Sequence, residues 1–380
     1  MRKLESLQLG RAAAVLGVLI FHLTGLSVGY QHGCFYGAWT QVLRAGVDVF
    51  FVISGVVMVV TTYRKIGEAG TGKRFLIHRV SRIYPPYLFL TVILTAFWIF
   101  RPSAVDSKTG VDLFSSYTLW PSNKLPLVQV GWTLSFEMMF YLAFFLIIVF
   151  AKKAWLPHAL ILWSVAVLAG TVALALDSSG ALISAFPRAN FFLSVYVLEF
   201  VAGCFIGLGY LKTSLIAGRT SVAVAIALFA LEAVAFQAIN FDGEYRSGLR
   251  VLLFAPPAAL LVYGLLTWET SGSLRAPRWA IRCGDISYSI YLVHVLVIHF
   301  AYRYMWRPFS NPVVRPLFLV FAGAVAIVSS VIFYTLIEKP FSTWTRMRLE
   351  ELFRVAPRKT IAASPVNRAI ELGAVSEAES

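Results

Sequence analysis

The sequence predicts an all-α protein, a polytopic integral-membrane bundle of about ten transmembrane helices. Hydrophobic residues make up 58% of the 380 positions and charged residues only 14%, whereas soluble domains carry about 25% charged residues. Ten apolar stretches occur, each near the roughly 20 residues that cross a hydrocarbon core of about 30 Å. These two observations exclude a soluble globular fold.

The predicted helices follow from the apolar stretches taken in chain order. Each stretch is long enough to span a bilayer and contains few charged residues. The predicted spans are residues 11–28, 44–63, 84–100, 132–150, 156–176, 193–211, 220–238, 249–267, 286–304 and 316–337.

The distribution of basic residues predicts the orientation. With the N-terminus in the cytoplasm and ten spans, most of the 33 Lys and Arg residues fall in cytoplasmic segments, as the positive-inside rule requires. We therefore expect an N-in, C-in topology in a bacterial inner (plasma) membrane, in contact with membrane lipids. This asymmetry explains the formal net charge of +14, and no nucleic-acid partner is expected.

We expect one membrane domain, residues 1–348, followed by a polar, mobile cytoplasmic tail at 349–380. The outer loop at 101–131 is too apolar for a plain solvated linker and is expected to fold back over the bundle. The first apolar segment is long enough to remain as a span, so no cleavable signal peptide is expected. Three cysteines, Cys34, Cys204 and Cys283, are predicted at different depths, which excludes a disulfide between them.

Two ionisable residues lie near the outer ends of the first two spans. An ionisable side chain inside a span costs about 2.5 to 3.5 kcal/mol on insertion scales, so it indicates function. His22 and Asp48 come within a few ångströms of a common depth if these spans form an antiparallel hairpin. Asp48 would then accept a hydrogen bond from His22 and leave the other ring nitrogen free as a base. A structural bridge between two helices is the alternative.

Glu137, in GWTLSFEMMFY, enters the fourth span from the same side. It adds a third ionisable group at similar depth, which favours a catalytic site over a structural bridge. His294, in SYSIYLVHVLVIHF, lies near the middle of its span, and we interpret it as a histidine that is hydrogen-bonded between helices.

Basic residues gather at the cytoplasmic end of the third span, in KRFLIHRVSRIYPPY. Arg79 and Arg82 are three residues apart and share one helix face, and Arg74 lies just upstream. Guanidinium groups bind phosphates through paired hydrogen bonds, whereas contact with lipid headgroups is the alternative. Phosphate-binding groups at the inner end and a base near the outer end suit a long phosphorylated donor such as coenzyme A.

Six ordered segments make the chain resemble a known family. They are LQLGRAAAVLGVLIFH, GVDVFFVISGVVM, RVSRIYPPY, VGWTLSFEMMFY, GDISYSIYLVH and IEKPF. The sequence resembles the integral-membrane acyltransferase-3 family over roughly residues 4–345, in particular members that decorate bacterial exopolysaccharide or lipopolysaccharide. It differs in having QLGR where LDGLR is more usual, and no fused esterase-like domain is expected.

The resemblance implies a ten-helix enzyme that moves an acyl group, usually acetyl, from cytoplasmic acyl-CoA to a hydroxyl of a glycan or lipid-linked saccharide at the outer face. It also implies that His22 is catalytic and that Arg79 and Arg82 matter for activity. Arg11, in the first motif, and Arg74 complete the candidate donor-binding residues. No metal is expected.

Two mechanisms remain open. His22 could act as general base on the acceptor hydroxyl, oriented by Asp48 or Glu137, or it could first accept the acyl group covalently. A proton-coupled transporter or flippase of an anionic or glycan substrate is the alternative function. The aromatic residues Trp39, Tyr117, Trp120 and Trp132 could stack on sugars or form the interfacial aromatic belt.

Overall fold

The computed structural model describes residues 4–29, 37–100, 112–122, 124–212, 216–239, 247–305 and 314–355. Within these ranges the chain is helical and contains no β-strand. The predicted position of Cys34, the loop residues 101–111 and the tail from 356 onward lie outside the described residues. Cys204 and Cys283 are both free.

The helices follow one another with short connections. The α-helices are α1 (Glu5–Gly29), α2 (Gly46–Thr62), α3 (Thr71–Phe100), α4 (Leu113–Thr118), α5 (Gly131–Phe150), α6 (Leu156–Leu176), α7 (Ala181–Ala185), α8 (Ala189–Phe192), α9 (Tyr196–Lys212), α10 (Gly218–Ala238), α11 (Ser247–Thr270), α12 (Arg278–Asp285), α13 (Ser287–Tyr304), α14 (Arg315–Phe333) and α15 (Lys339–Leu352). Short 3-10 helices cover Ala38–Ala45, Tyr63–Lys65 and Lys153–Trp155, and a π-helical turn covers Tyr334–Glu338.

The helices confirm a polytopic membrane bundle. Among the described residues, nine helices are long and apolar enough to cross a membrane, or ten when α12 and α13 are taken as one span bent by 71°. The expected third span, 84–100, is only the second half of α3, which begins at Thr71. The expected tenth span continues without a break through the π-helical turn into α15.

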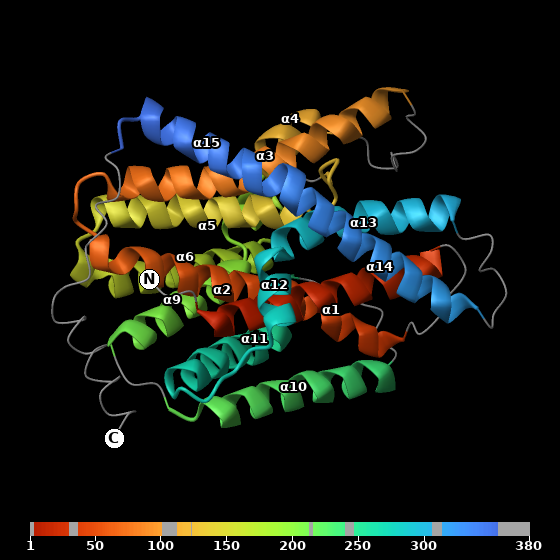
Figure 1. Cartoon of the computed structure of the whole chain (residues 1–380). Coiled ribbons are helices and arrows are strands. Elements are labelled where there is room, and N and C mark those ends of the chain that lie inside the picture. Colours follow the sequence, from red (N-terminus) through yellow and green to blue (C-terminus); the bar gives the residue numbers. More distant parts are fainter. Residues whose placement is uncertain are drawn as a thin grey trace, which may run out of the picture.

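Helix α1 lies in the interior of the bundle (Figure 1), packed against α2, α11, α12 and α13. Helix α10 lies at one edge, while α3 and α15 lie side by side at the other. We call the end of the bundle where α1 begins and α15 ends the N-terminal face, and the other end the opposite face (Figure 1). Because α1 is central, its polar side chains face protein rather than lipid.

Small residues let α2 approach its neighbours closely. A Cβ atom added to Gly55 of α2 would lie 2.0 Å from the carbonyl oxygen of Phe200, and one added to Gly203 of α9 would lie 2.0 Å from that of Val52. Backbones that touch at glycine are a common way to pack helices in membranes, where the hydrophobic effect does not drive helix association. This contact fixes the rotation of α2, and with it the direction of its polar side chains.

Helix α3 contains Pro85 and Pro86, directly after its arginines. Each proline lacks a backbone N–H and so leaves a carbonyl one turn earlier without its helical partner. The hydroxyl of Tyr288 donates to the carbonyl of Ile83 (2.9 Å) in this turn. The weakened turn is thus tied to α13, next to Arg79 and Arg82.

The segment before α5 folds back over the bundle, as its composition predicts. The hydroxyl of Tyr87 donates to the carbonyl of Ser116 (2.6 Å), and that of Tyr84 to the carbonyl of Thr118 (2.7 Å). Hydrogen bonds from the backbone and side chain of Ser115 hold the pKa of the Asp112 carboxyl below its ordinary value. Asp112 caps α4 in this way, so the fold-back begins from a defined turn.

Candidate active site

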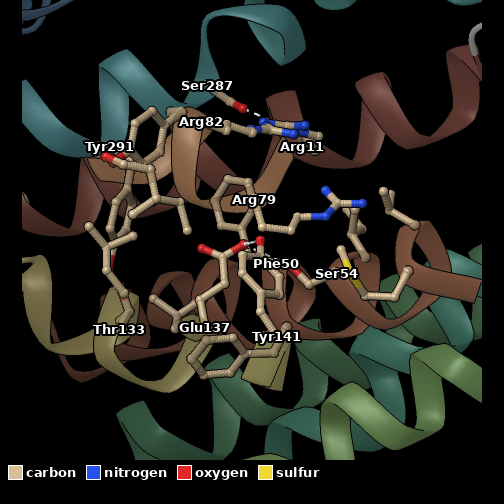
Figure 2. Close-up of a pocket in the computed structure, with 18 residues that line it drawn as sticks. Arg11, Phe50, Ser54, Arg79, Arg82, Thr133, Glu137, Tyr141, Ser287 and Tyr291 are labelled. Atoms are coloured by element: carbon tan, nitrogen blue, oxygen red, sulfur yellow. Dashed lines mark hydrogen bonds between the residues drawn. The ribbon is translucent and has the colours of Figure 1, made fainter. Parts of the chain in front are cut away.

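A polar pocket lies in the interior, between α1, α2, α3, α5 and α13 (Figure 2). Three arginines line it: Arg11 from α1 and both Arg79 and Arg82 from α3. Glu137 and Tyr141 line it from α5. We call this the central pocket; it brings together three of the four predicted donor-binding arginines.

Glu137 is held by two hydroxyl groups rather than by a histidine. Its Oε1 accepts a hydrogen bond from Ser54 (3.2 Å) and another from Tyr141. Across the pocket, Nε of Arg11 donates to the hydroxyl of Ser287 (3.0 Å). Figure 2 shows the carboxylate of Glu137 facing the side of the pocket where Arg79 lies. Glu137 thus places a carboxylate in the same pocket as the three arginines.

His22 contacts a second histidine. Its Nδ1 lies 3.2 Å from Nε2 of His294 and 2.9 Å from the carbonyl oxygen of Val18. The two rings meet edge to face, with centroids 4.9 Å apart. His294 is fully buried, so the interhelical hydrogen bond expected of it is present and its partner is His22.

These contacts select the tautomers of both rings. Nδ1 of His294 lies 2.9 Å from the carbonyl oxygen of Ile290, and because a carbonyl only accepts, Nδ1 carries the hydrogen and Nε2 is the acceptor. Nδ1 of His22 therefore donates to both Nε2 of His294 and the carbonyl of Val18. In the neutral form of His22, the lone pair is then on Nε2, the nitrogen that a base requires.

His22 lines a separate cavity of about 200 Å³, which we call the histidine cavity. Its wall includes Trp132 and Arg44, together with Leu125 and Gln129 from the segment that folds back before α5. His22 is the eighteenth residue of α1, so at 1.5 Å per residue it lies about 26 Å from the start of that helix. The cavity therefore lies toward the opposite face.

Asp48 does not pair with His22, which corrects the sequence-based expectation. Its carboxylate accepts hydrogen bonds from Arg250 of α11, at 2.6 Å to Nη2 and 3.2 Å to Nε. Both side chains are buried, with exposed fractions of 0% and 3%. Helix spacing predicts a common depth for Asp48 and His22, but depth does not determine which neighbouring helix a side chain faces. Asp48 faces α11, and its charge is neutralised there.

A third cavity, of about 710 Å³, opens beside α3 toward the N-terminal face. Four basic side chains of the α2–α3 region line it: Lys65, Arg74, Arg79 and Arg82. We call it the basic cavity. Its volume is within the range of about 300 to 1,000 Å³ that is common for ligand sites.

The three cavities adjoin one another. Arg79 and Arg82 line both the basic cavity and the central pocket. Val47 and Tyr291 line both the central pocket and the histidine cavity. The three cavities therefore form a series from the arginines of α3 to His22, and Val47 and Tyr291 separate the central pocket from the histidine cavity.

Several residues of the site escaped the sequence analysis. Ser54 and Tyr141 carry no charge and gave no signal in apolar helices. Arg250 is an arginine near the start of a predicted span, and the insertion cost of a charge could have singled it out. For His294, the sequence predicted a hydrogen bond between helices but not that its partner is His22.

Of the four aromatic residues expected near the outer end, Trp132 lines the histidine cavity. Trp120 packs against Phe192 (6.3 Å between centroids) and under Arg188 (5.9 Å). Trp39 is 41% exposed, as expected of an interfacial belt. Among the described residues, no group of three metal-ligating side chains could hold an ion.

The fold and these cavities define a class of protein, an integral-membrane helix bundle with a charged interior site. The family follows from comparison with known sequences. A family profile described as an acyltransferase domain (Acyl_transf_3) matches residues 4–335. The chain belongs to this integral-membrane acyltransferase-3 family, as its motifs indicate.

Curated relatives agree with this assignment. The chain is 38% identical over 268 residues to the exopolysaccharide production protein ExoZ of Rhizobium meliloti (strain 1021), covering 67% of this chain and 76% of ExoZ. It is 28% identical over 321 residues to the acyltransferase MdmB of Streptomyces mycarofaciens, covering 77% and 79%. It is also 28% identical over 173 residues to the O-acetyltransferase OatA of Staphylococcus aureus, covering 40% of this chain and 26% of OatA. No solved structure matches.

Proposed function

We propose that this protein is a membrane O-acyltransferase that moves an acyl group, acetyl in the first instance, from cytoplasmic acyl-CoA to a hydroxyl of a cell-surface polysaccharide or glycolipid. The observation that carries the proposal is the series of cavities between the basic residues of α3 and His22. Membership of an acyltransferase family favours this chemistry over a transporter or flippase.

The donor is proposed to enter from the N-terminal face, with its phosphates in the basic cavity. The basic residues concentrated at that face support a cytoplasmic location, and a bacterial inner membrane would give the donor access from the cytoplasm. Arg74, Arg79 and Arg82 would bind phosphate oxygens. The thioester would then extend through the central pocket, past Arg11, toward His22.

His22 is proposed to be the general base. Its Nε2 would take the proton from the acceptor hydroxyl while the hydroxyl oxygen attacks the thioester carbonyl carbon. The C–S bond then breaks, the protonated His22 returns the proton to the leaving thiolate, and the products are the O-acyl ester and free CoA thiol. Arg44 lines the same cavity and would offset the negative charge on the carbonyl oxygen.

Asp48 and Glu137 have supporting roles in this proposal. Asp48 would keep Arg250 neutralised at the wall of the histidine cavity, and Glu137 would balance the charge of the arginines before the donor binds. His294 replaces both carboxylates as the residue proposed to orient His22. A covalent acyl-His22 intermediate uses the same free Nε2 and remains the alternative route.

Inside-out vesicles with a surface-glycan acceptor and acetyl-labelled acetyl-CoA test the proposal. We expect wild type to label the glycan and His22→Ala at equal expression to lower the label by about 10²- to 10⁴-fold, the contribution typical of a general base. Labelling by both proteins alike would remove His22 from the chemistry. If wild type moves the glycan or an anion across the membrane without acylation, the protein is a transporter.

A further inference from the structure

Helix α15 lies outside the residues that the acyltransferase profile matches, which end at 335, yet it forms one wall of the basic cavity. The cavity is lined on this side by Ser342, Thr343, Arg346, Met347 and Glu350. The helix reaches this position because α14 continues through the π-helical turn along α3 (Figure 1). The donor cavity therefore has a wall that the family comparison does not cover.

Two residues that line this cavity each have a buried polar atom without a partner among the described residues. These atoms are Nε of Arg79, from the α3 wall, and Oγ of Ser342, from the α15 wall. A buried donor without a hydrogen bond costs about 1 to 3 kcal/mol, so such atoms are uncommon without a reason. Each of the two groups can donate a hydrogen bond, and both residues line the same cavity, so an acceptor bound there could be reached from both walls by a small rotation of either side chain.

The charges that line the cavity agree with an anionic ligand. Within the described residues, Arg346 forms no ion pair or hydrogen bond, and it lines the cavity whose other wall carries Arg74 and Arg79. The acidic residue at this end, Glu350, is paired with His78 of α3 (3.1 Å). That pair ties α15 to α3. The α15 wall carries Arg346 and Glu350, and the net positive charge of the cavity comes from the basic residues of the opposite wall.

We propose that α15 completes the donor site, with Arg346 and Ser342 binding phosphate oxygens of the nucleotide end of acyl-CoA opposite Arg79. This inference rests on the proposed function, and it adds a binding wall to the residues already assigned to the donor. The shared chemistry is a phosphate group, which a lipid headgroup could also supply. The size of the cavity, about 710 Å³, and its position next to the central pocket, with which it shares Arg79 and Arg82, favour the nucleotide.

A matched control lies two residues away on the same helix. Arg348 pairs with Glu351 (3.1 Å), and these side chains are 65% and 68% exposed, outside the cavity lining. R346Q and R348Q remove the same charge from α15, so an effect of overall charge would be equal in both. S342A removes the second proposed contact at little risk to folding.

The test is binding of free CoA to the purified full-length protein in nanodiscs of phosphatidylcholine, measured by calorimetry. We expect R346Q to weaken CoA binding about tenfold, or about 1.4 kcal/mol, S342A to weaken it less, and R348Q to leave it unchanged. If R346Q weakens the binding of CoA but not that of 3′-dephospho-CoA, Arg346 contacts the 3′-phosphate. If R346Q weakens the binding of both, Arg346 contacts the diphosphate. Either result supports the inference.

Other outcomes would overturn it. If wild type binds CoA and R346Q binds it equally well, α15 is not part of the donor site, although the proposed function survives. If wild type does not bind CoA, the proposed donor fails together with this inference. If R346Q loses only binding to nanodiscs that contain phosphatidylglycerol, Arg346 contacts a lipid headgroup. Thermal unfolding of each variant, and R346K if R346Q is unstable, separates loss of binding from loss of folding.

Discussion

Replacement of His294 tests whether the histidine pair orients the base. His294→Leu places an apolar side chain of comparable bulk in a fully buried position and removes the acceptor for Nδ1 of His22. His294→Gln offers a carbonyl oxygen at about the reach of Nε2, so it can still accept that hydrogen bond. The two variants therefore differ in the property that the mechanism requires.

The magnitude follows from the hydrogen bonds of His22. Its Nδ1–H has two acceptors, His294 at 3.2 Å and the carbonyl of Val18 at 2.9 Å. When His22 takes the proton, these bonds become charge-assisted, with about 1.5 to 3 kcal/mol each. At about 1.36 kcal/mol per factor of ten, losing one lowers kcat by roughly 10- to 150-fold. Since Val18 remains, we expect a value near the lower end.

The assay is the glycan-labelling reaction, with kcat and KM for acetyl-CoA determined separately. We expect His294→Leu to lower kcat with little change in KM, because His294 is not among the residues that line the donor cavities, and His294→Gln to recover most of the loss. Equal activity of His294→Leu and wild type would refute the reasoning. Equal losses in both variants, with a matching drop in thermal stability, would show that His294 only holds α13 against α1.

Two further predictions concern charged residues elsewhere in the bundle. Asp48→Asn should lower the free energy of unfolding by about 3 to 5 kcal/mol because it leaves Arg250 buried without its counter-charge. The double variant Asp48→Leu/Arg250→Met should recover much of this loss. Thermal unfolding in detergent measures both variants, and an unchanged stability of Asp48→Asn would contradict the pairing. Arg79→Gln should raise KM for acetyl-CoA about tenfold with kcat nearly unchanged, because it removes a contact to a phosphate of the donor and no group that takes part in the acyl transfer. A fall in kcat at constant KM would place Arg79 at the reacting atoms.

Much of the architecture could be predicted because lipid imposes a simple rule on sequence. A span needs about 20 apolar residues with its backbone hydrogen bonds satisfied internally, so hydropathy alone located the helices. The rule fails where a helix continues past the membrane. Arg79 and Arg82 lie inside α3 and Arg346 lies in α15, in polar segments that hydropathy does not mark as parts of long helices.

The sequence by itself also selected His22 and Glu137, because an ionisable residue in an apolar segment is costly and therefore conspicuous. It selected the arginines of α3 because basic residues gather at one end of a predicted span. Only the tertiary structure decided their partners. Asp48 meets Arg250 across 202 residues of sequence, and His22 meets His294 across 272. The position of a residue along a helix gives the depth of its side chain, but the direction of the side chain depends on how the helix is rotated against its neighbours. Contacts such as that of Gly55 with the backbone of α9 set this rotation, and they form only when the bundle packs.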